Sequence, residues 1–501
     1  MSPLTTIRNA QPQPLSGLPE TGPSEFRQGI LEQVEEGGRL AALFGTPSHD
    51  GKIRIIGVTA NDQAGLLCAG STIVTDAYPS LTPECPQAHL FEREIYEQWG
   101  VKPEGHPWLK PVRSPSPAPP SAMTRCAAEA PRQNDFFRVD GEEVHEVAVG
   151  PVHAGIIEPG HFRFQCHGEH VFHLEISLGY QHRGVERALA EAPGRKTIHY
   201  IETLAGDTTV GHATAHCNAV ESLAGARVSA RVHALRAVAL ELERLANHTG
   251  DLGALAGDVG FLPTASYCGR IRGDFLNMTA ILCGNRFGRG FVRPMGCPLE
   301  PGPGAVALLL ERMAMARRDV TSAVELLWEA PSVLARFENT GTVSPETCRL
   351  LGLVGPAARA CGLFQDVRVD FPTGIYRMAH IPVSVYQTGD VLARALVRWL
   401  EIQRSMTFIE EQLRHLPEKG TEAAGGAPAA ESMVVSLVEG WRGEICHVIL
   451  TDAAGKHARH KVVDPSFHNW MGLAAALREQ QISDFPLCNK SFNLSYCGHD
   501  L

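Results

Sequence analysis

The chain has 501 residues, of which 44% are hydrophobic, and this length and composition predict two or more domains. Its 45 lysines and arginines against 55 aspartates and glutamates give a formal net charge of -10, which excludes a broad basic surface for nucleic acid or an anionic bilayer. No stretch approaches about 18 uncharged apolar residues, so we expect neither a membrane span nor a secretory signal, and any membrane link should run through a partner.

Cysteine usage argues against a local metal site or a disulfide framework. The 13 cysteines are an odd number in a chain without a signal core, which indicates reduced thiols in a cytosolic compartment. The closest pair in sequence is Cys488 and Cys497, so no CxxC motif occurs. Neither a conventional local zinc site nor a local iron–sulfur run can therefore be built from this sequence.

Residues 1–112 are predicted to form a small α/β domain. A helical pattern covers 29–45 (GILEQVEEGGRLAALFG), a strand-like pattern covers 52–60 (KIRIIGVTA), and a second helical pattern covers 91–100 (FEREIYEQWG). Residues 113–135 follow as a linker, because the run SPSPAPPSA favours an extended, poorly packed spacer.

Residues 136–501 are predicted to form a large, mainly helical domain with a small β portion. Long helical patterns cover 230–258 and 304–329, which is typical of a helical bundle. The run EKGTEAAGGAPAAE at 418–431 is predicted to be a surface loop before a strand pair within 434–452. The fold class expected for the whole chain is α+β.

The segment FEREIYEQWGVKPEGHPWLKPV, residues 91–112, resembles the signature of the small hydrophilic 30-kDa subunit that lies beside the quinone subunit of complex I. The resemblance implies that residues 1–112 are a docking domain. The alternative interpretation is an amphipathic helix followed by a Pro-Gly turn. Fusion of such a domain to a large subunit is similar to the large subunit of formate hydrogenlyase.

A second resemblance covers most of the remaining chain. Five motifs occur in the order found in large subunits of complex I and membrane-bound nickel-iron hydrogenases: GPVHAGIIEPGHFRF (150–164), GYQHRGVE (179–186), VGPAARACGLFQDVR (354–368), GDVLARALVRWLEI (389–402) and EGWRGEICH (439–447). In the last motif Trp441 stands where proline is usual. The resemblance implies the large-subunit fold of this superfamily over residues 136–501.

The nickel-iron hydrogenases of this superfamily hold their metals with two CxxC motifs, because metals that carry carbonyl and cyanide need polarisable sulfur donors. The first motif corresponds to AGDTTVGH here, with Ala205 and Thr208 at the cysteine positions. The second corresponds to SFNLSYCGHDL, with Ser495 and Gly498 at those positions. We therefore expect vacated metal-ligand positions and no metal held by this chain.

Three cysteines near these motifs are left as candidates for an unusual metal site: Cys217, Cys488 and Cys497. Cys497 lies one residue out of register with the second motif. On an extended segment, a shift of one residue turns the side chain to the opposite face. We accordingly expect Cys497 to point away from the ligand position.

Proton relay is the role that the resemblance implies for Glu158, because IEPGHF matches the motif of a glutamate that passes protons near the hydrogenase metal. Its apolar neighbours Ile156 and Ile157 favour that interpretation. The alternative is a glutamate tied to a neighbouring backbone group or arginine.

Asp207 and His212 are further candidates for proton relay. Together with Thr208 and His216 they lie where the metal cavity would have been, and we expect them to line a polar pocket or proton path.

Four other histidines also suggest a metal site: His161, His167, His170 and His173. They fall in a segment that is predicted to be strand and loop rather than helix, and no cysteine or acid cluster completes a site there, so we interpret them as ordinary structural or exposed side chains.

Arg183 and His182, in the turn GYQHRGVE, are expected to face an iron–sulfur cluster of an adjoining small subunit. In complex I the arginine of this motif lies against that cluster, where a fixed cation favours the reduced form and raises its potential. The alternative is that Arg183 pins its turn through a carboxylate such as Glu186.

In complex I, the quinone headgroup is bound by a histidine of the motif His-Pro-Ala-Ala-His. His153 matches the first histidine of that motif, but the position of the second histidine is Ile157 here, so the resemblance gives only weak support for quinone binding.

The function expected is that of an oxidoreductase subunit, active only within a membrane-associated, energy-converting complex that couples electron transfer from ferredoxin-like or nicotinamide-dependent partners to proton or ion translocation. Two alternatives are a true nickel-iron hydrogenase subunit with altered ligands and a non-redox assembly subunit. We expect no cofactor bound by this chain alone, an iron–sulfur cluster in the adjacent small subunit, and quinone at the interface as an open option. The expected partners are the iron–sulfur small subunit, other hydrophilic subunits and antiporter-like membrane subunits, on the cytoplasmic face of the membrane.

Overall fold

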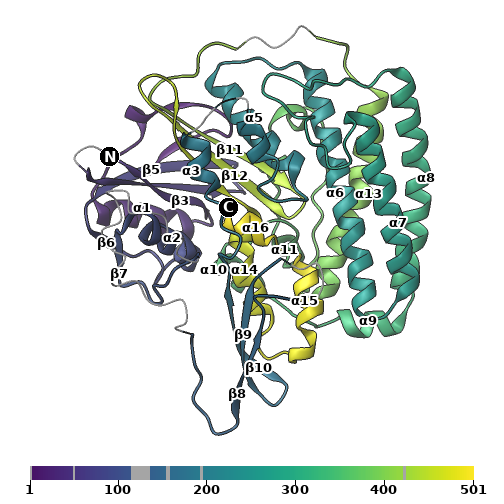
Figure 1. The fold of residues 1–501 in the computed structure, drawn as a ribbon, viewed down its shortest axis with the longest axis horizontal. Coiled ribbons are helices and arrows are strands. Elements are labelled where there is room, and N and C mark those ends of the chain that lie inside the picture. Colours follow the sequence, from purple (N-terminus) through teal and green to yellow (C-terminus); the bar gives the residue numbers. More distant parts are fainter. Residues whose placement is uncertain are drawn as a thin grey trace.

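The computed structural model describes residues 3–48, 51–113, 136–153, 158–191, 194, 196–420 and 425–501. The predicted linker therefore lies outside the described residues, apart from Arg113 at its start. Within the described part the protein has an N-terminal sheet with helices, a second sheet at the centre and a row of long helices at the far side (Figure 1). This mixture confirms the expected α+β class.

The N-terminal layer is a four-stranded antiparallel sheet in the order β1–β5–β4–β3, with helices α1 and α2 against it. Its main elements are β1 (Thr5–Ile7), α1 (Pro23–Glu35), β3 (Arg39–Pro47), β4 (Ile53–Asn61), β5 (Leu66–Val74) and α2 (His89–Trp99). The smaller ones are the 3-10 turns η1 (Leu15–Gly17) and η3 (Pro86–Ala88) and the parallel pair β6 (Ala77–Pro79) and β7 (Lys102–Glu104).

The strand predicted at 52–60 and the helix predicted at 91–100 are confirmed, but the continuous helix predicted over 29–45 is wrong. Helix α1 ends at Glu35, and Gly37 then adopts a φ of 90°, a conformation that favours glycine. The eight residues of β3 before Pro47 are all buried. An apolar run covered on both faces forms a strand here, although its composition suits a helix equally well.

The second sheet has the order β13–β12–β11–β2, and it joins the N-terminal part of the chain to the rest. Its strands are β2 (Gln13–Pro14), β11 (Ser432–Gly440), β12 (Gly443–Thr451) and β13 (His457–Val463). Apolar side chains of both sheets share one buried cluster, which includes Leu43, Ile55, Val435, Leu437 and Val448. The N-terminal part thus packs directly on the large part, and the division at residue 112 stays a prediction.

Four long helices lie side by side at the opposite edge of the molecule (Figure 1). They are α6 (Ala230–Asp258), α7 (Leu262–Cys283), α8 (Pro303–Trp328) and α13 (Val391–Arg414). The hydroxyl of Ser229 caps α6 and the carboxylate of Asp390 caps α13, each by accepting a backbone N–H in the first turn. The helices predicted over 230–258 and 304–329 are confirmed.

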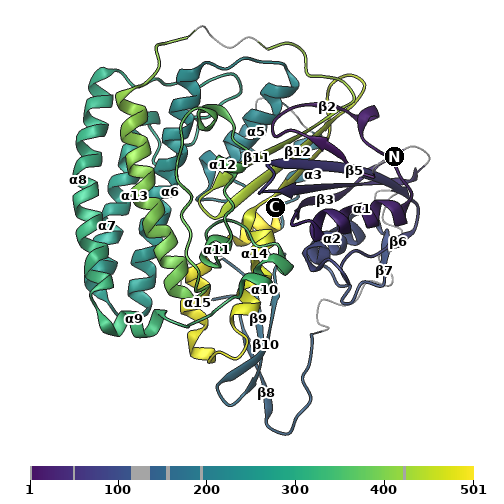
Figure 2. The same cartoon turned by 180° about the vertical axis from the view of Figure 1, so that it is seen from behind.

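A three-stranded antiparallel sheet extends from the body, with the C-terminal helices beside its base (Figure 2). These elements are β8 (Val144–Val149), β9 (His161–His167), β10 (His170–Ser177), η5 (Ile482–Asp484), α14 (Pro465–Ala476), α15 (Phe485–Phe492) and α16 (Tyr496–Asp500). The other helices are α3 (Val185–Glu191), α4 (Thr197–Ile201), α5 (Thr209–Leu223), α9 (Pro331–Phe337), α10 (Pro345–Leu351), α11 (Gly355–Ala360), α12 (Val367–Asp370) and η4 (Gly374–Arg377). Among the described residues, no helix has the length and apolar character needed to cross a membrane.

Candidate functional site

The two segments predicted to have lost their cysteines lie together in the structure. The first, Ala205 to Thr208, is the turn that leads into α5, and the second surrounds the short helix α16. The guanidinium of Arg183 donates to the carbonyl oxygens of Leu204, at 2.9 Å, and of Cys497, at 3.2 Å. One side chain therefore ties both segments, which are far apart in sequence, into one site.

None of the residues at the four predicted ligand positions carries a thiol, and their surroundings are filled by other contacts. Ala205 is fully buried, and the hydroxyl of Thr208 accepts a hydrogen bond from the Trp441 indole at 3.1 Å. Ser495 caps α16, accepting from the backbone N–H of Gly498 at 2.9 Å. A Cβ on Gly498 would lie only 2.7 Å from the carboxyl carbon of Asp464, so glycine is required there.

This donor set does not fit a nickel-iron group, whose low-valent metals need several sulfur ligands. The correspondence of the four positions to hydrogenase ligand positions stays a prediction. Burial raises the pKa of the Cys488 thiol to about 12, and it also raises the pKa of the Cys217 thiol.

Cys497 differs from the sequence-based expectation in its backbone. The prediction placed it on an extended segment, pointing away from the ligand position, and that is wrong because residues 496–500 form helix α16. Its sulfur lies 3.4 Å from the hydroxyl of Ser495, within the site. Burial, followed by the charge of Glu158, raises the pKa of the Cys497 thiol to about 11. The thiol is therefore protonated at neutral pH.

Arg442 and Trp441 occupy the turn between β11 and β12 and reach into the site. Arg442 forms a two-bond ion pair with Asp207, with Nη1–Oδ1 at 2.6 Å and Nη2–Oδ2 at 2.7 Å, and it also donates to the carbonyl of Asn493. Its guanidinium lies 3.9 Å from the centre of the Trp441 ring system. Burial is the largest single effect and disfavours the charge of Arg442, but the carboxylates of Asp207, Asp464 and Asp251 together raise its pKa.

Close backbone packing explains why the turn of the EGWRGE motif meets the VGPA motif. Gly443 has a φ of 133°, and a Cβ on it would lie 2.9 Å from the Cα of Gly355. Gly355, with a φ of 67°, would in turn place a Cβ 2.3 Å from the Cα of Gly443. Glycine at both positions lets the two backbones touch, and this contact fixes where Arg442 enters the site.

Glu158 lies at the N-terminus of α16, where its carboxylate accepts the backbone N–H of Tyr496 at 3.2 Å. It is half-buried and close enough to Cys497 to influence that thiol. The alternative to proton relay was a Glu158 carboxylate tied to a neighbouring backbone group, and that hydrogen bond is present. The carboxylate nevertheless lies next to the site. Ile156 and Ile157 lie outside the described residues. His153 hydrogen-bonds the carbonyl of Gly160 at 2.9 Å.

Arg183 and His182 are exposed beside the same site. Arg183 donates to backbone carbonyls, including that of Thr203 at 2.7 Å, and His182 Nδ1 lies 2.8 Å from the carbonyl oxygen of Asp500. The alternative pairing of Arg183 with Glu186 is wrong, because Glu186 instead pairs with Arg459 and Lys461. The expectation that Arg183 and His182 face an iron–sulfur cluster of a partner subunit stays a prediction.

His212 joins the site to a line of buried histidines behind it. Its Nε2 lies 3.0 Å from Oδ2 of Asp464, and its Nδ1 lies 3.1 Å from Nε2 of His447. His447 Nδ1 is in turn 3.0 Å from Nε2 of His460, and the ring of His216 stacks on His460. Sequence reasoning singled out His212 and His216 but missed His447 and His460, because nothing in the sequence shows how these strands pair.

Glu243 is a second residue that sequence reasoning missed. It lies on α6 and accepts the backbone N–H groups of Val210, at 2.7 Å, and Gly211, at 3.1 Å, at the start of α5. Burial, which the nearby charge of Asp207 reinforces, raises the pKa of its carboxyl to about 8. A carboxyl that titrates near neutral pH next to Asp207 is suited to proton exchange.

The four histidines on β9 and β10 do not converge. His161 Nδ1 approaches the carbonyl of Gly150 at 3.2 Å, and His167 pairs with Glu143 at 2.7 Å. Within the described ranges, one group of three side chains brings potential metal-ligand atoms within 4.8 Å of one another, and its members are His216, His447 and His460. The interpretation of these β-strand histidines as ordinary side chains is consistent with these contacts.

The fold and these motifs define a class. The chain belongs to the superfamily of complex I and nickel-iron hydrogenase large subunits, with a small-hydrophilic-subunit-like segment fused before it. Residues 258–431 and 422–500 match the family described as respiratory-chain NADH dehydrogenase, 49 Kd subunit, and residues 63–119 match the corresponding 30 Kd subunit.

Three relatives illustrate its range. The chain is 28% identical over 485 residues to formate hydrogenlyase subunit 5 of Escherichia coli, covering 93% of this chain and 85% of the relative. It is 29% identical to a carbon monoxide-induced hydrogenase of Rhodospirillum rubrum, covering 70% and 97%. It is 28% identical to NADH-quinone oxidoreductase subunit 4 of Thermus thermophilus, covering 68% and 90%. The chain is thus an oxidoreductase subunit of the hydrogenase-related, complex I-like class.

Proposed function

We propose that this chain is the large subunit of a membrane-associated, energy-converting oxidoreductase complex and works without a nickel-iron centre. The observation that carries the proposal is the ion pair of Arg442 and Asp207, which joins the first ligand-position turn to the motif EGWRGE. A guanidinium and carboxylates gather at the positions that we predict to correspond to hydrogenase thiolates, and such groups handle protons and charge but do not hold low-valent metals.

Electron transfer is assigned to the exposed face formed by Arg183 and His182, which would meet the iron–sulfur small subunit of the complex. A cation close to a cluster stabilises its reduced, more negative form, so Arg183 would raise the cluster potential. The cluster belongs to the partner in this proposal. Other hydrophilic subunits and antiporter-like membrane subunits complete the complex, and they would hold the chain at the cytoplasmic face of the membrane.

Proton coupling is assigned to the carboxylates and the histidine that border the site. Glu158, Asp207 and His212 were predicted from the sequence, and Glu243 joins them because its carboxyl titrates near neutral pH. These groups could take up or release a proton when the charge of the adjoining cluster changes. Quinone at the interface is the weaker option, because His153 is engaged with the carbonyl of Gly160.

The decisive experiment is metal and activity analysis of the purified native complex, with its subunits identified. We expect iron and sulfide in cluster stoichiometry, nickel far below one per chain, and no hydrogen evolution with a low-potential donor. Stoichiometric nickel together with hydrogen evolution would establish a hydrogenase with altered ligands instead. A complex that performs its task without any reducible cluster next to this chain would establish the assembly role.

A further inference from the structure

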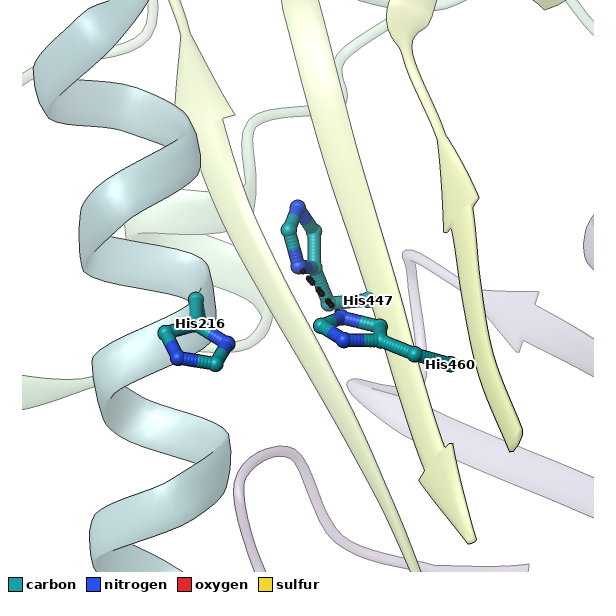
Figure 3. Close-up of side chains that lie close together, drawn as sticks. All are labelled: His216, His447 and His460. Atoms are coloured by element: carbon teal, nitrogen blue, oxygen red, sulfur yellow. Dashed lines mark hydrogen bonds between the residues drawn. The ribbon is translucent and has the colours of Figure 1, made fainter. Parts of the chain in front are cut away.

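Three buried histidines from three different elements meet between a helix and the central sheet. His216 lies on α5, His447 on β12 and His460 on β13, and one ring nitrogen of each lies within 4.8 Å of those of the other two (Figure 3). Their exposed fractions are 3%, 0% and 0%. This cluster is separate from the four positions predicted to have lost cysteines.

Burial of these rings is not explained by hydrogen bonding within the described part of the chain. Nδ1 of His216 and Nδ1 of His460 are buried without any partner there. No carboxylate in the described residues hydrogen-bonds directly to any of the three rings. A buried polar atom without a partner costs free energy, so the unpartnered Nδ1 of His216 points to a bound group that satisfies it.

The spacing of the rings suits a shared metal ion. Ring centres are 5.1 Å apart for His447 and His460 and 5.5 Å apart for His216 and His460. Two imidazoles on one tetrahedral ion, each with a metal–nitrogen bond of about 2.0 Å, have centres roughly 5 Å apart. The nitrogens of His447 and His460 are 3.0 Å apart, close to the ~3.3 Å edge of such a tetrahedron.

An outer layer of hydrogen bonds orients the cluster. Asp464 Oδ2 is 3.0 Å from His212 Nε2, and His212 Nδ1 is 3.1 Å from His447 Nε2. The carboxylate can accept from His212, whose other nitrogen then accepts from His447, which leaves Nδ1 of His447 with a free lone pair. A carboxylate–histidine chain of this kind is the usual support of a metal-bound imidazole.

We propose that His216, His447 and His460 bind one divalent first-row transition ion, with zinc as the probe. Three imidazoles without a neighbouring carboxylate favour such ions over magnesium or calcium. Burial, with the neighbouring rings as a smaller cause, lowers the pKa of His216 to about 3 and lowers those of the other two, so all three stay neutral and available as ligands. The ion would hold α5, which starts at the candidate site, against the sheet that carries Arg442.

The test is zinc binding to the purified full chain after treatment with a chelator. Wild type should take up one zinc per chain in a form that resists gel filtration, and His447→Gln and His216→Gln should lose it. His212→Gln, which removes only the outer support, should weaken zinc binding by about 10- to 100-fold. His89→Gln, at a half-buried histidine on α2, is the matched control and should bind zinc as wild type does.

A second measurement needs only wild type, in case a variant fails to fold. Cobalt(II) added to the chelated chain should produce the visible absorption bands of a low-symmetry nitrogen site and saturate at one equivalent. Wild type that binds neither ion would overturn the proposal and leave the histidines as a hydrogen-bonded chain only. Binding that survives in His447→Gln and His216→Gln would also overturn it.

Discussion

The guanidinium of Arg442 and the carboxylate of Asp207 form a two-bond ion pair that links the turn before α5 to the turn between β11 and β12. The Arg442 side chain is 4% exposed and that of Asp207 is 35% exposed. The same guanidinium also donates to the carbonyl of Asn493, so it connects three segments of the chain. Its replacement should therefore disturb the site as a whole.

Arg442→Met should lower the free energy of unfolding of the full chain by about 2 kcal/mol, because it removes the charged donor of Asp207 and the guanidinium donor of the Asn493 carbonyl. The partial exposure of Asp207 keeps the loss below that of a fully buried pair. Urea denaturation measures the change. Arg414→Met is the control, since Arg414 is 60% exposed and 3.8 Å from Glu410. Equal losses for both variants would contradict this assignment.

Cys497 and Glu158 should be electrostatically linked. Since burial and then the Glu158 charge raise the pKa of the Cys497 thiol to about 11, Glu158→Gln should lower that pKa and increase the thiolate fraction at pH 8 to 9. The rate of alkylation by iodoacetamide, followed for the Cys497 peptide by mass spectrometry, measures this. Cys68 in the same chain is the internal control and should keep its rate. An unchanged Cys497 rate would show that the two groups are not neighbours.

Much of the fold could be predicted from periodicity and motif order. The helices over 230–258 and 304–329 have long apolar stripes, which local sequence shows directly. The break at Gly37 and the five-residue helix α16 were not predicted, because a buried strand resembles a buried helix in composition and one helical turn has no period. The segment around Cys497 was misjudged for this second reason.

The site was predicted only in part, since its other half depends on strand pairing. In the β12–β13 ladder His447 lies opposite Val462, and Ile449 lies opposite His460, so the two histidines are diagonal neighbours on one face of the sheet. Only that register, together with α5 packed above it, brings His216 to the same place. Glu243 was missed similarly, because it reaches the start of α5 from a different helix.

Glu243 should make stability depend on pH. Its carboxyl has a pKa raised to about 8 in the folded protein, mainly by burial, against 4.5 for the ordinary group. The folded state therefore holds a proton that the unfolded state has released, so the free energy of unfolding should fall as pH rises from 5 towards 8. The Glu243 carboxyl should contribute at most about 1.4 kcal/mol per pH unit to this slope of the free energy of unfolding.

Glu243→Gln should remove most of that slope, because glutamine cannot ionise, although its single amide oxygen can accept only one of the two N–H groups of Val210 and Gly211 that the carboxyl accepts. Urea denaturation of the full chain at pH 5.5, 6.5 and 7.5 measures the slope for each protein. Glu329→Gln, at an exposed residue after α8, should keep the wild-type slope. A Glu243→Gln slope equal to that of wild type would show that this carboxyl is already ionised in the folded protein.

Arg183→Met should lower the reduction potential of the adjoining cluster in the purified complex, because removal of a fixed cation destabilises the more negative, reduced form. A spectroscopic redox titration measures the potential, and a shift of roughly tens of millivolts is expected. Arg187→Met is the matched control, since Arg187 is exposed on neighbouring α3 and faces Glu191 at 3.8 Å. A cluster that titrates identically in both variants and in wild type would limit Arg183 to its backbone contacts with Thr203, Leu204 and Cys497.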